Sequence, residues 1–358
     1  MNSIKTALDL IKEGWKSQRI RLVNTKMTSN DFELLKETLI NNSAVKCVEL
    51  CLCKLNENDI IEFAHEMSKF SLVGLQLAHV GLTEKGAFAL SAGIQECSLK
   101  KLDISFNRLS AKGTGAFADA LRDCGLESLL LGNNNMGPEG AIYLANVLLN
   151  VSTTLTTLDI SRNQIGSKGL IAISEALVKT SIDTLMCDGN QIRFNGIKSL
   201  CKSLSVCPLM SVLSLEANQL EDDSVIELSS VLRYTKMEKL CLHENEITDA
   251  GIEVLSVAIR NLPTMRILDL RRNPHLTDKS VDTLKRDLKT HRKMFKIHLD
   301  DCDGISLQKR TELENMVLAL QSERARTMTI LCAVKMFPRY GNIIIPIELF
   351  RNLANMLG

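Results

Sequence analysis

A short pattern of apolar and polar residues recurs through most of this chain at a spacing of 27 to 29 residues. Two apolar residues stand two positions apart, an Asn follows, and another apolar residue comes two positions after the Asn, as in Leu102, Ile104, Asn107 and Leu109. A fixed period of this length predicts a repeat protein in which each unit stacks on its neighbours. The Asn anchors are Asn107, Asn134, Asn163, Asn190, Asn218, Asn245 and Asn273, and the frame extends to Thr25, Cys53, Val80 and Cys302.

Each unit predicts one strand and one helix. Apolar residues two apart share one face of a short strand. A small residue six positions after the anchor, such as Gly140, then starts apolar residues at helical spacing, with Ala141, Leu144 and Leu148. Eleven such units predict a parallel sheet covered by helices on one side. Because helices are wider than strands, the stack must curve with the sheet on its concave face.

The Asn side chains are expected to form a buried ladder. Each amide has one acceptor and two donor hydrogens, so it satisfies backbone groups that the turn after the strand leaves without partners. Thr25, Cys53 and Cys302 partly replace Asn through weaker donors. Val80 has no polar group, so we expect slack or a water molecule beside it.

The repeat pattern LxxLxLxxNxL followed by a G-x-x-x-L-x-x-x-L helix resembles the leucine-rich repeats of the ribonuclease-inhibitor type. The same repeats occur in the sensing ends of NLR immune receptors and in RanGAP proteins. The resemblance covers about residues 17–305. It implies an α/β leucine-rich-repeat solenoid, a curved horseshoe arc with about eleven parallel strands inside, helices outside and a helical cap at each end. It leaves the function open, because this scaffold has many different partners.

Three segments are expected along the chain. Residues 1–16 form an N-terminal helical cap, residues 17–305 form the repeats, and residues 306–358 form a C-terminal helical cap or tail that begins with one long helix over 306–336. The segment 345–349 (IPIEL) is similar to the opening of an F-box, which docks on an adaptor of ubiquitin ligases. The tail 338–358 is therefore either a second cap layer or a docking motif.

Composition narrows the class of protein. The formal net charge is +1, and no apolar run approaches the ~18 residues of a membrane span. The first fifteen residues lack the apolar region of a secretory signal. Eleven Cys without disulfide-type spacing are typical of reduced thiols in a cytoplasmic protein. We expect a monomer that does not span a membrane.

Strand parity identifies the side chains that face the concave side. Across four rows of these positions, eight Lys and Arg stand against nine Asp and Glu, and Phe106 is the single aromatic residue. This balance disfavours a nucleic-acid groove, which needs rows of cations and aromatic platforms. Apolar residues among charges favour a protein partner. The candidate contact residues are Asp103, Phe106, Leu130, Asp159, Arg162, Met186, Asp188, Glu216, His243, Glu244, Asp269, Arg271, Arg272 and His298.

Catalysis is not expected. Cys241, His243, Asp269 and His298 are of metal-ligand type, but an open sheet face supplies no closed cavity. The pair of Cys241 and His243 has no oxyanion pocket and no cleft that excludes water. We therefore predict no cofactor, no metal and no enzymatic activity.

The predicted function is binding of a macromolecular partner on the concave face. A stand-alone solenoid is also typical of effectors that intracellular bacteria inject into host cytoplasm, where ubiquitin-pathway proteins are among the targets. The alternatives are a RanGAP-like regulator of small GTPases, although the acidic tail of that class is missing, and a stand-alone NLR-like sensing or inhibitor protein.

Overall fold

The computed structural model describes residues 18–289, 291, 293–294 and 296–336, with the backbone alone described over 323–336. One sheet contains eleven parallel strands in chain order, so each unit pairs only with its neighbours. The strands are β1 (Arg19–Val23), β2 (Cys47–Cys51), β3 (Gly74–Ala78), β4 (Lys101–Asp103), β5 (Ser128–Leu130), β6 (Thr157–Asp159), β7 (Thr184–Met186), β8 (Val212–Ser214), β9 (Lys239–Cys241), β10 (Ile267–Asp269) and β11 (Lys296–His298).

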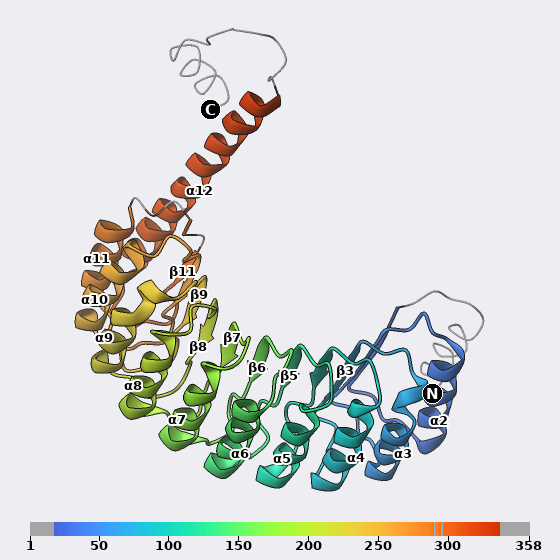
Figure 1. The fold of residues 1–358 in the computed structure, drawn as a ribbon. Coiled ribbons are helices and arrows are strands. Elements are labelled where there is room, and N and C mark those ends of the chain that lie inside the picture. The colour runs from blue at the N-terminus through green and yellow to red at the C-terminus, as the bar shows by residue number, and fades with distance from the viewer. Residues whose placement is uncertain (1–17, 290, 292, 295, 337–358) are drawn as a thin grey trace.

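Helices line the outer side of the arc, and the sheet lines the inner side (Figure 1). The predicted α/β solenoid is confirmed. The helices are α2 (Ser29–Asn41), α3 (Glu57–His65), α4 (Glu84–Gln95), α5 (Ser110–Ala120), α6 (Gly137–Asn150), α7 (Gly166–Leu177), α8 (Arg193–Leu204), α9 (Asp222–Val231), α10 (Asp249–Arg260), α11 (Asp278–Leu288) and α12 (Leu307–Met336). Two 3-10 turns, η1 (Met67–Lys69) and η2 (Leu232–Tyr234), follow α3 and α9.

The register of the sheet follows the repeat. Asp103 lies opposite Leu130, Leu130 opposite Asp159, and Asp159 opposite Met186. The apolar residue before each of these positions, such as Leu129, is fully buried between sheet and helices. Each concave row therefore contains one residue from every unit, as parity predicts.

The Asn side chains form a buried ladder, in which Oδ1 of Asn134 has no hydrogen-bond partner among the described residues. Asn107 accepts the backbone N–H groups of Val80 and Leu82, and its amide donates to the carbonyl groups of Leu77 and Ile104. The thiols of Cys53 and Cys302 donate to the equivalent carbonyl oxygens, of Leu22 and Leu270, at 3.5 and 3.4 Å. These thiols donate hydrogen bonds as the Asn amide does. They have no equivalent of the amide oxygen, which accepts backbone N–H groups in the Asn units. At the buried Val80 the ladder is interrupted.

A sharp turn follows every strand. The residue before each anchor has a positive φ, between 50° and 60° throughout, including Phe106 at 60° and Gly189 at 60°. This left-handed conformation is unfavourable for most L-residues, but here the stacked units impose it on every turn. Most residues at this position, including Phe106, Arg162 and Arg272, are exposed.

The helix starts show a second ladder that the sequence pattern did not reveal. Glu57, in the first turn of α3, accepts the N–H groups of Thr83 and Gly86 at the start of α4. Asp222 and Asp249 bind Thr248 and Thr277 of the following units in the same way. Each acidic residue thus caps the helix of the next unit as well as lying in the first turn of its own.

Four of the described helices are also capped by a residue of their own unit. Thr28, Asn56, Thr248 and Thr277 each accept a backbone N–H of the first turn with the side chain. The side chain of Thr83 instead donates to Glu57, so it takes no part in capping its own helix.

The C-terminal end of the arc is covered by α12. This helix spans nearly the predicted range, and Leu313 and Val317 of its first half are buried against the last unit. The helix then extends away from the arc (Figure 1). The predicted N-terminal cap over 1–16 and the tail over 338–358 lie outside the described residues. Within the described residues, no helix has the length and apolar character of a membrane span.

Candidate binding surface on the concave sheet

Three carboxylates lie close together at the centre of the concave face, and we call Asp103, Asp159 and Asp188 the acidic patch. Each accepts a backbone N–H: Asp103 and Asp159 from the residue two positions ahead, and Asp188 from Glu216, just after strand β8. No described Lys, Arg or His comes within 4.0 Å of these three carboxylates, although ion pairs are common elsewhere on the face. The acidic patch therefore has no internal counter-charge.

The surroundings of Asp159 and Asp188 disfavour the ionised forms of these two carboxylates. Burial raises the pKa of Asp159, the charge of Asp103 raises it further, and hydrogen bonds from Ser161 oppose the shift. Burial also raises the pKa of Asp188, against hydrogen bonds from Ser214 and Glu216, and the charges of Glu216 and Asp159 add to the rise. A cation brought to this place would stabilise the charged forms.

Apolar side chains lie within the same area. Phe106 is 51% exposed, Leu130 is half-buried between Asp103 and Asp159 of the middle row, and the half-buried Met186 lies between Asp159 and Ser214. The backbone hydrogen bond from Phe106 to Gly132 holds the turn that carries the phenyl ring. The structure thus brings together Asp103, Phe106, Leu130, Asp159, Met186 and Asp188 as one surface.

The other predicted contact residues lie towards the C-terminal end and are compensated by their neighbours. Arg271 donates to both oxygens of Asp269, whose pKa stays low because these bonds outweigh the effect of burial. Arg272 pairs with Glu244 at 3.4 Å and with Asp301 at 3.3 Å. Because of these ion pairs, the C-terminal part of the concave face has little uncompensated charge for a partner to recognise.

Arg162 joins the two regions. Its guanidinium lies 3.7 Å from Oε1 of Glu216, and Oε2 of the same carboxylate faces the imidazole of His243. His243 is buried, and its ring lies between Glu216 and Glu244. One donor atom from each of these three residues lies within 4.8 Å of the others.

This donor group differs from the set considered in the sequence. Cys241, Asp269 and His298 are not part of it. Burial raises the pKa of the Cys241 thiol, which removes the thiolate that a nucleophile or metal ligand needs at neutral pH. The ten described cysteines are free thiols, and burial raises the pKa of Cys201 to about 12.

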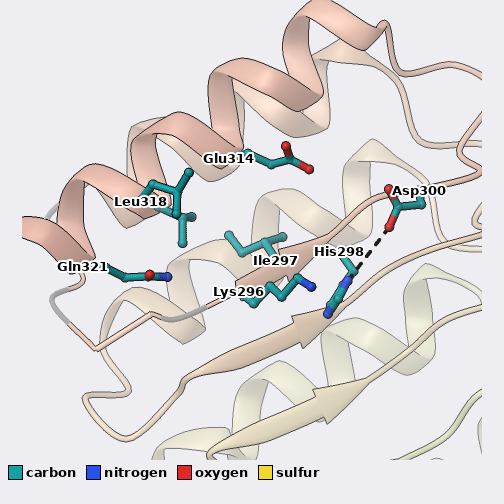
Figure 2. Close-up of a pocket in the computed structure, with 8 residues that line it drawn as sticks. Lys296, Ile297, His298, Asp300, Glu314, Leu318 and Gln321 are labelled. Atoms are coloured by element: carbon teal, nitrogen blue, oxygen red, sulfur yellow. Dashed lines mark ion pairs between the residues drawn. The ribbon is translucent and has the colours of Figure 1, made fainter.

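His298 lies at the last strand, next to a groove of about 500 Å³ between β11 and α12. Figure 2 shows Lys296, Ile297 and His298 on one side and Glu314 and Leu318 of α12 on the other. Burial lowers the pKa of His298, so the ring is mainly neutral at pH 7. This groove is separate from the acidic patch and was not visible in the sequence.

A second groove, of about 340 Å³, lies on the helical side. It is lined by the exposed rings of Phe88 and Tyr143, with Gly115 between them. The phenol of Tyr143 donates to Asp119. The repeat pattern assigns these positions only to the outer helix face, so nothing in it marked them as neighbours.

Comparison with known proteins agrees with this architecture. The family model described as "Leucine Rich repeat" matches residues 95–118, 124–145 and 151–174. A ribonuclease inhibitor of Mus musculus is 27% identical over 184 residues, which are 50% of this chain and 40% of the relative. Residues 95–174 therefore contain leucine-rich repeats, and the chain is similar in sequence to a ribonuclease inhibitor.

The fold of this chain is also similar to a solved one. A chain in the crystal structure of the Rad7 and Elc1 complex in yeast superposes with a TM-score of 0.54 and 16% identity, covering 86% of this chain and 85% of the other. At this identity the likeness concerns the fold alone. The matched part of the ribonuclease inhibitor is under half of that protein's length.

Proposed function

We propose that this protein is a non-enzymatic binding module whose concave face holds a protein partner through a basic and apolar segment. The observation that carries the proposal is the acidic patch, whose three carboxylates have no cation partner among the described residues. Leucine-rich repeats of this type and the likeness to a ribonuclease inhibitor support a role in binding.

The chemistry of the partner follows from the surface. Lys or Arg side chains would neutralise Asp103, Asp159 and Asp188, and burial disfavours the ionised forms of Asp159 and Asp188. An apolar side chain beside them would cover Phe106, Leu130 and Met186. Such an apolar anchor next to desolvated charge pairs is the usual composition of an interface hot spot.

The surface is largely preformed. The Asn ladder and the sheet hold the strands in one arrangement, so binding requires little ordering of the backbone on this side. The partner pays the larger ordering cost if its segment is flexible.

A peptide-display selection on the immobilised protein tests the proposal. We expect selected peptides to contain Lys or Arg next to apolar residues, and the affinity of one such peptide to fall at least about tenfold in the double variant Asp159→Asn/Asp188→Asn. Phe106→Asp/Met186→Glu should abolish binding. Asp300→Asn, an exposed carboxylate on the same face, is the matched control and should bind normally.

Selection of acidic peptides, or equal binding by the double variant and the wild type, would refute the proposal. The cellular partner is a separate question. A ubiquitin-pathway protein and a small GTPase are the two candidates that the family resemblance suggests. A GTP hydrolysis assay with purified small GTPases separates a RanGAP-like regulator from a simple binder, because only the regulator accelerates hydrolysis.

A further inference from the structure

Three potential metal ligands converge near the C-terminal half of the concave face. Glu216 and His243 occupy the same row on neighbouring units, and Nδ1 of the imidazole lies 3.1 Å from Oε2 of the carboxylate. Glu244 follows His243 directly in the chain. Its φ of 56° belongs to the sharp turn after the strand, and its Oε2 lies 3.8 Å from Nε2 of the same imidazole.

The Nδ1 atom of the buried His243 imidazole has no hydrogen-bond partner in the part of the chain that the structure describes. His243 is only 9% exposed, and its Nδ1 atom is inaccessible to solvent. The nearby oxygen of Glu216 lies off the axis along which Nδ1 would donate, so the short distance makes no hydrogen bond. A buried polar atom of this kind normally has a partner. A cation held between nitrogen and carboxylate supplies one.

We propose that Glu216, His243 and Glu244 form a binding site for a divalent transition metal, with Zn²⁺ as the best match. One imidazole and two carboxylates are a donor set that zinc accepts, with a water molecule at the fourth position on the open side. Hard cations such as Mg²⁺ and Ca²⁺ disfavour the nitrogen ligand.

A small movement of the side chains would bring the three donor atoms to the separation found in a tetrahedral zinc site. The three donor atoms lie within 4.8 Å of one another, whereas bonds of ~2.0–2.2 Å in a tetrahedral site bring donors to roughly 3.4 Å. The side chain of Glu244 is half exposed, so it is free to move towards the imidazole. The buried His243 and the partly buried Glu216 already stand close together.

Two arginines compete for the carboxylates without blocking them. Arg162 faces Oε1 of Glu216, which leaves Oε2 towards His243. Arg272 pairs with both Glu244 and Asp301. It therefore keeps Asp301 as a carboxylate partner when Glu244 turns to the metal. The site should therefore bind zinc more weakly than a site without neighbouring cations.

Isothermal titration of the metal-free protein with ZnCl₂ tests the site. We expect one zinc ion per chain and a fall in affinity of at least about tenfold in Glu244→Gln, whose exposed side chain makes the variant safe for folding. His243→Ala should abolish this binding event. Mg²⁺ at the same concentration should give no heat of binding.

The chain offers a matched control. His275 lies 3.1 Å from Glu246 on the neighbouring unit, but both side chains are exposed and no third donor among the described residues joins them. His275→Ala should bind zinc like the wild type. Substitution with Co²⁺ separates this site from the thiols, because a nitrogen and oxygen site gives visible bands without the strong near-ultraviolet charge transfer of a thiolate ligand.

Unchanged zinc affinity in Glu244→Gln and His243→Ala, a thiolate band in the cobalt spectrum, or no binding by the wild type would each overturn the proposal. The site does not include the acidic patch. Asp159→Asn, which lies outside the three donors, should leave zinc affinity unchanged, so the two proposals fail separately.

Discussion

The side-chain oxygen of Asn163 accepts a hydrogen bond of 2.9 Å from the backbone N–H of Asn134, one unit earlier in the stack. The same oxygen accepts the N–H of Met136, and the amide nitrogen donates to the carbonyl groups of Leu131 and Ile160. One buried side chain therefore satisfies backbone groups of two units. Because water does not reach these groups, no other partner replaces the amide.

Replacing this residue should be strongly destabilising. Asn163→Ala leaves several buried backbone groups without partners, each at a cost of ~1–3 kcal/mol, so we expect the free energy of unfolding to fall by at least about 3 kcal/mol. Urea denaturation followed by circular dichroism measures the loss. Asn150→Ala, on the exposed side of α6, is the control and should change stability little. A loss of less than ~1 kcal/mol in Asn163→Ala would contradict the role assigned to the ladder.

The interruption at Val80 predicts a stabilising substitution. By analogy with Asn107, an Asn at this position would donate to a carbonyl of the preceding unit and accept two backbone N–H groups from it. We expect Val80→Asn to raise the free energy of unfolding by about 1 kcal/mol. The same urea experiment checks it. Leu82→Asn, at a fully buried apolar position two residues later, should instead destabilise the protein.

The ionised carboxylate of Asp159 is expected to lower the stability of the folded protein and to strengthen peptide binding. Its pKa in the folded protein is raised, mainly by burial, so ionisation costs folding energy. The stability associated with the neutral carboxyl is fully present below the ordinary pKa and is lost as pH rises through the raised one. Asp159→Asn should therefore raise the free energy of unfolding at pH 7 and leave it nearly unchanged at low pH, while peptide affinity falls.

Denaturation curves of Asp159→Asn between pH 3 and pH 7 measure this difference. A variant that is equally or less stable than the wild type at pH 7 would show that the ionised carboxylate is well accommodated. Asp300→Asn should show no comparable gain, because Asp300 is exposed.

Asp287 shows the opposite linkage. Bonds from Arg286 outweigh burial and, with Ser256 and the charge of Arg260, lower its pKa from 3.8 to about 2. This carboxylate contributes stability above its ordinary pKa, and the contribution is lost as pH falls from about 4 towards 2. Asp287→Asn should be less stable than the wild type at pH 7, with the gap narrowing as pH falls through that range.

Parallel denaturation of wild type and Asp287→Asn at pH 7, 5 and 3 checks the window. Ser256→Ala, which removes a single neutral donor to the same carboxylate, should cost less than Asp287→Asn at pH 7. A gap that stays constant between pH 7 and pH 3 would mean that the ion pairs contribute no stability.

The sequence predicted which residues lie on the concave face, but it did not predict which of their charges are paired. Strand parity placed Asp159 and Asp269 alike in the middle concave row, and the structure keeps both there. Their charges behave differently because Arg271 binds Asp269, while no described cation reaches Asp159. Which arginine bends towards which carboxylate depends on rotamers and on the turn geometry, neither of which has a periodic signature.

The repeat by itself determined the number of units, their order, the register of the sheet and the buried Asn ladder. A constant period with apolar residues on one strand face leaves a single way to stack the units without exposing the core. Only the tertiary structure decided how side chains of neighbouring units combine. The cap that Glu57 provides for the next helix, the counter-ion pairs of Arg272 and the convergence of Glu216 on His243 all join residues about 27 positions apart. These contacts depend on distances of a few ångströms between side chains, and a pattern of residue types along the chain does not contain those distances.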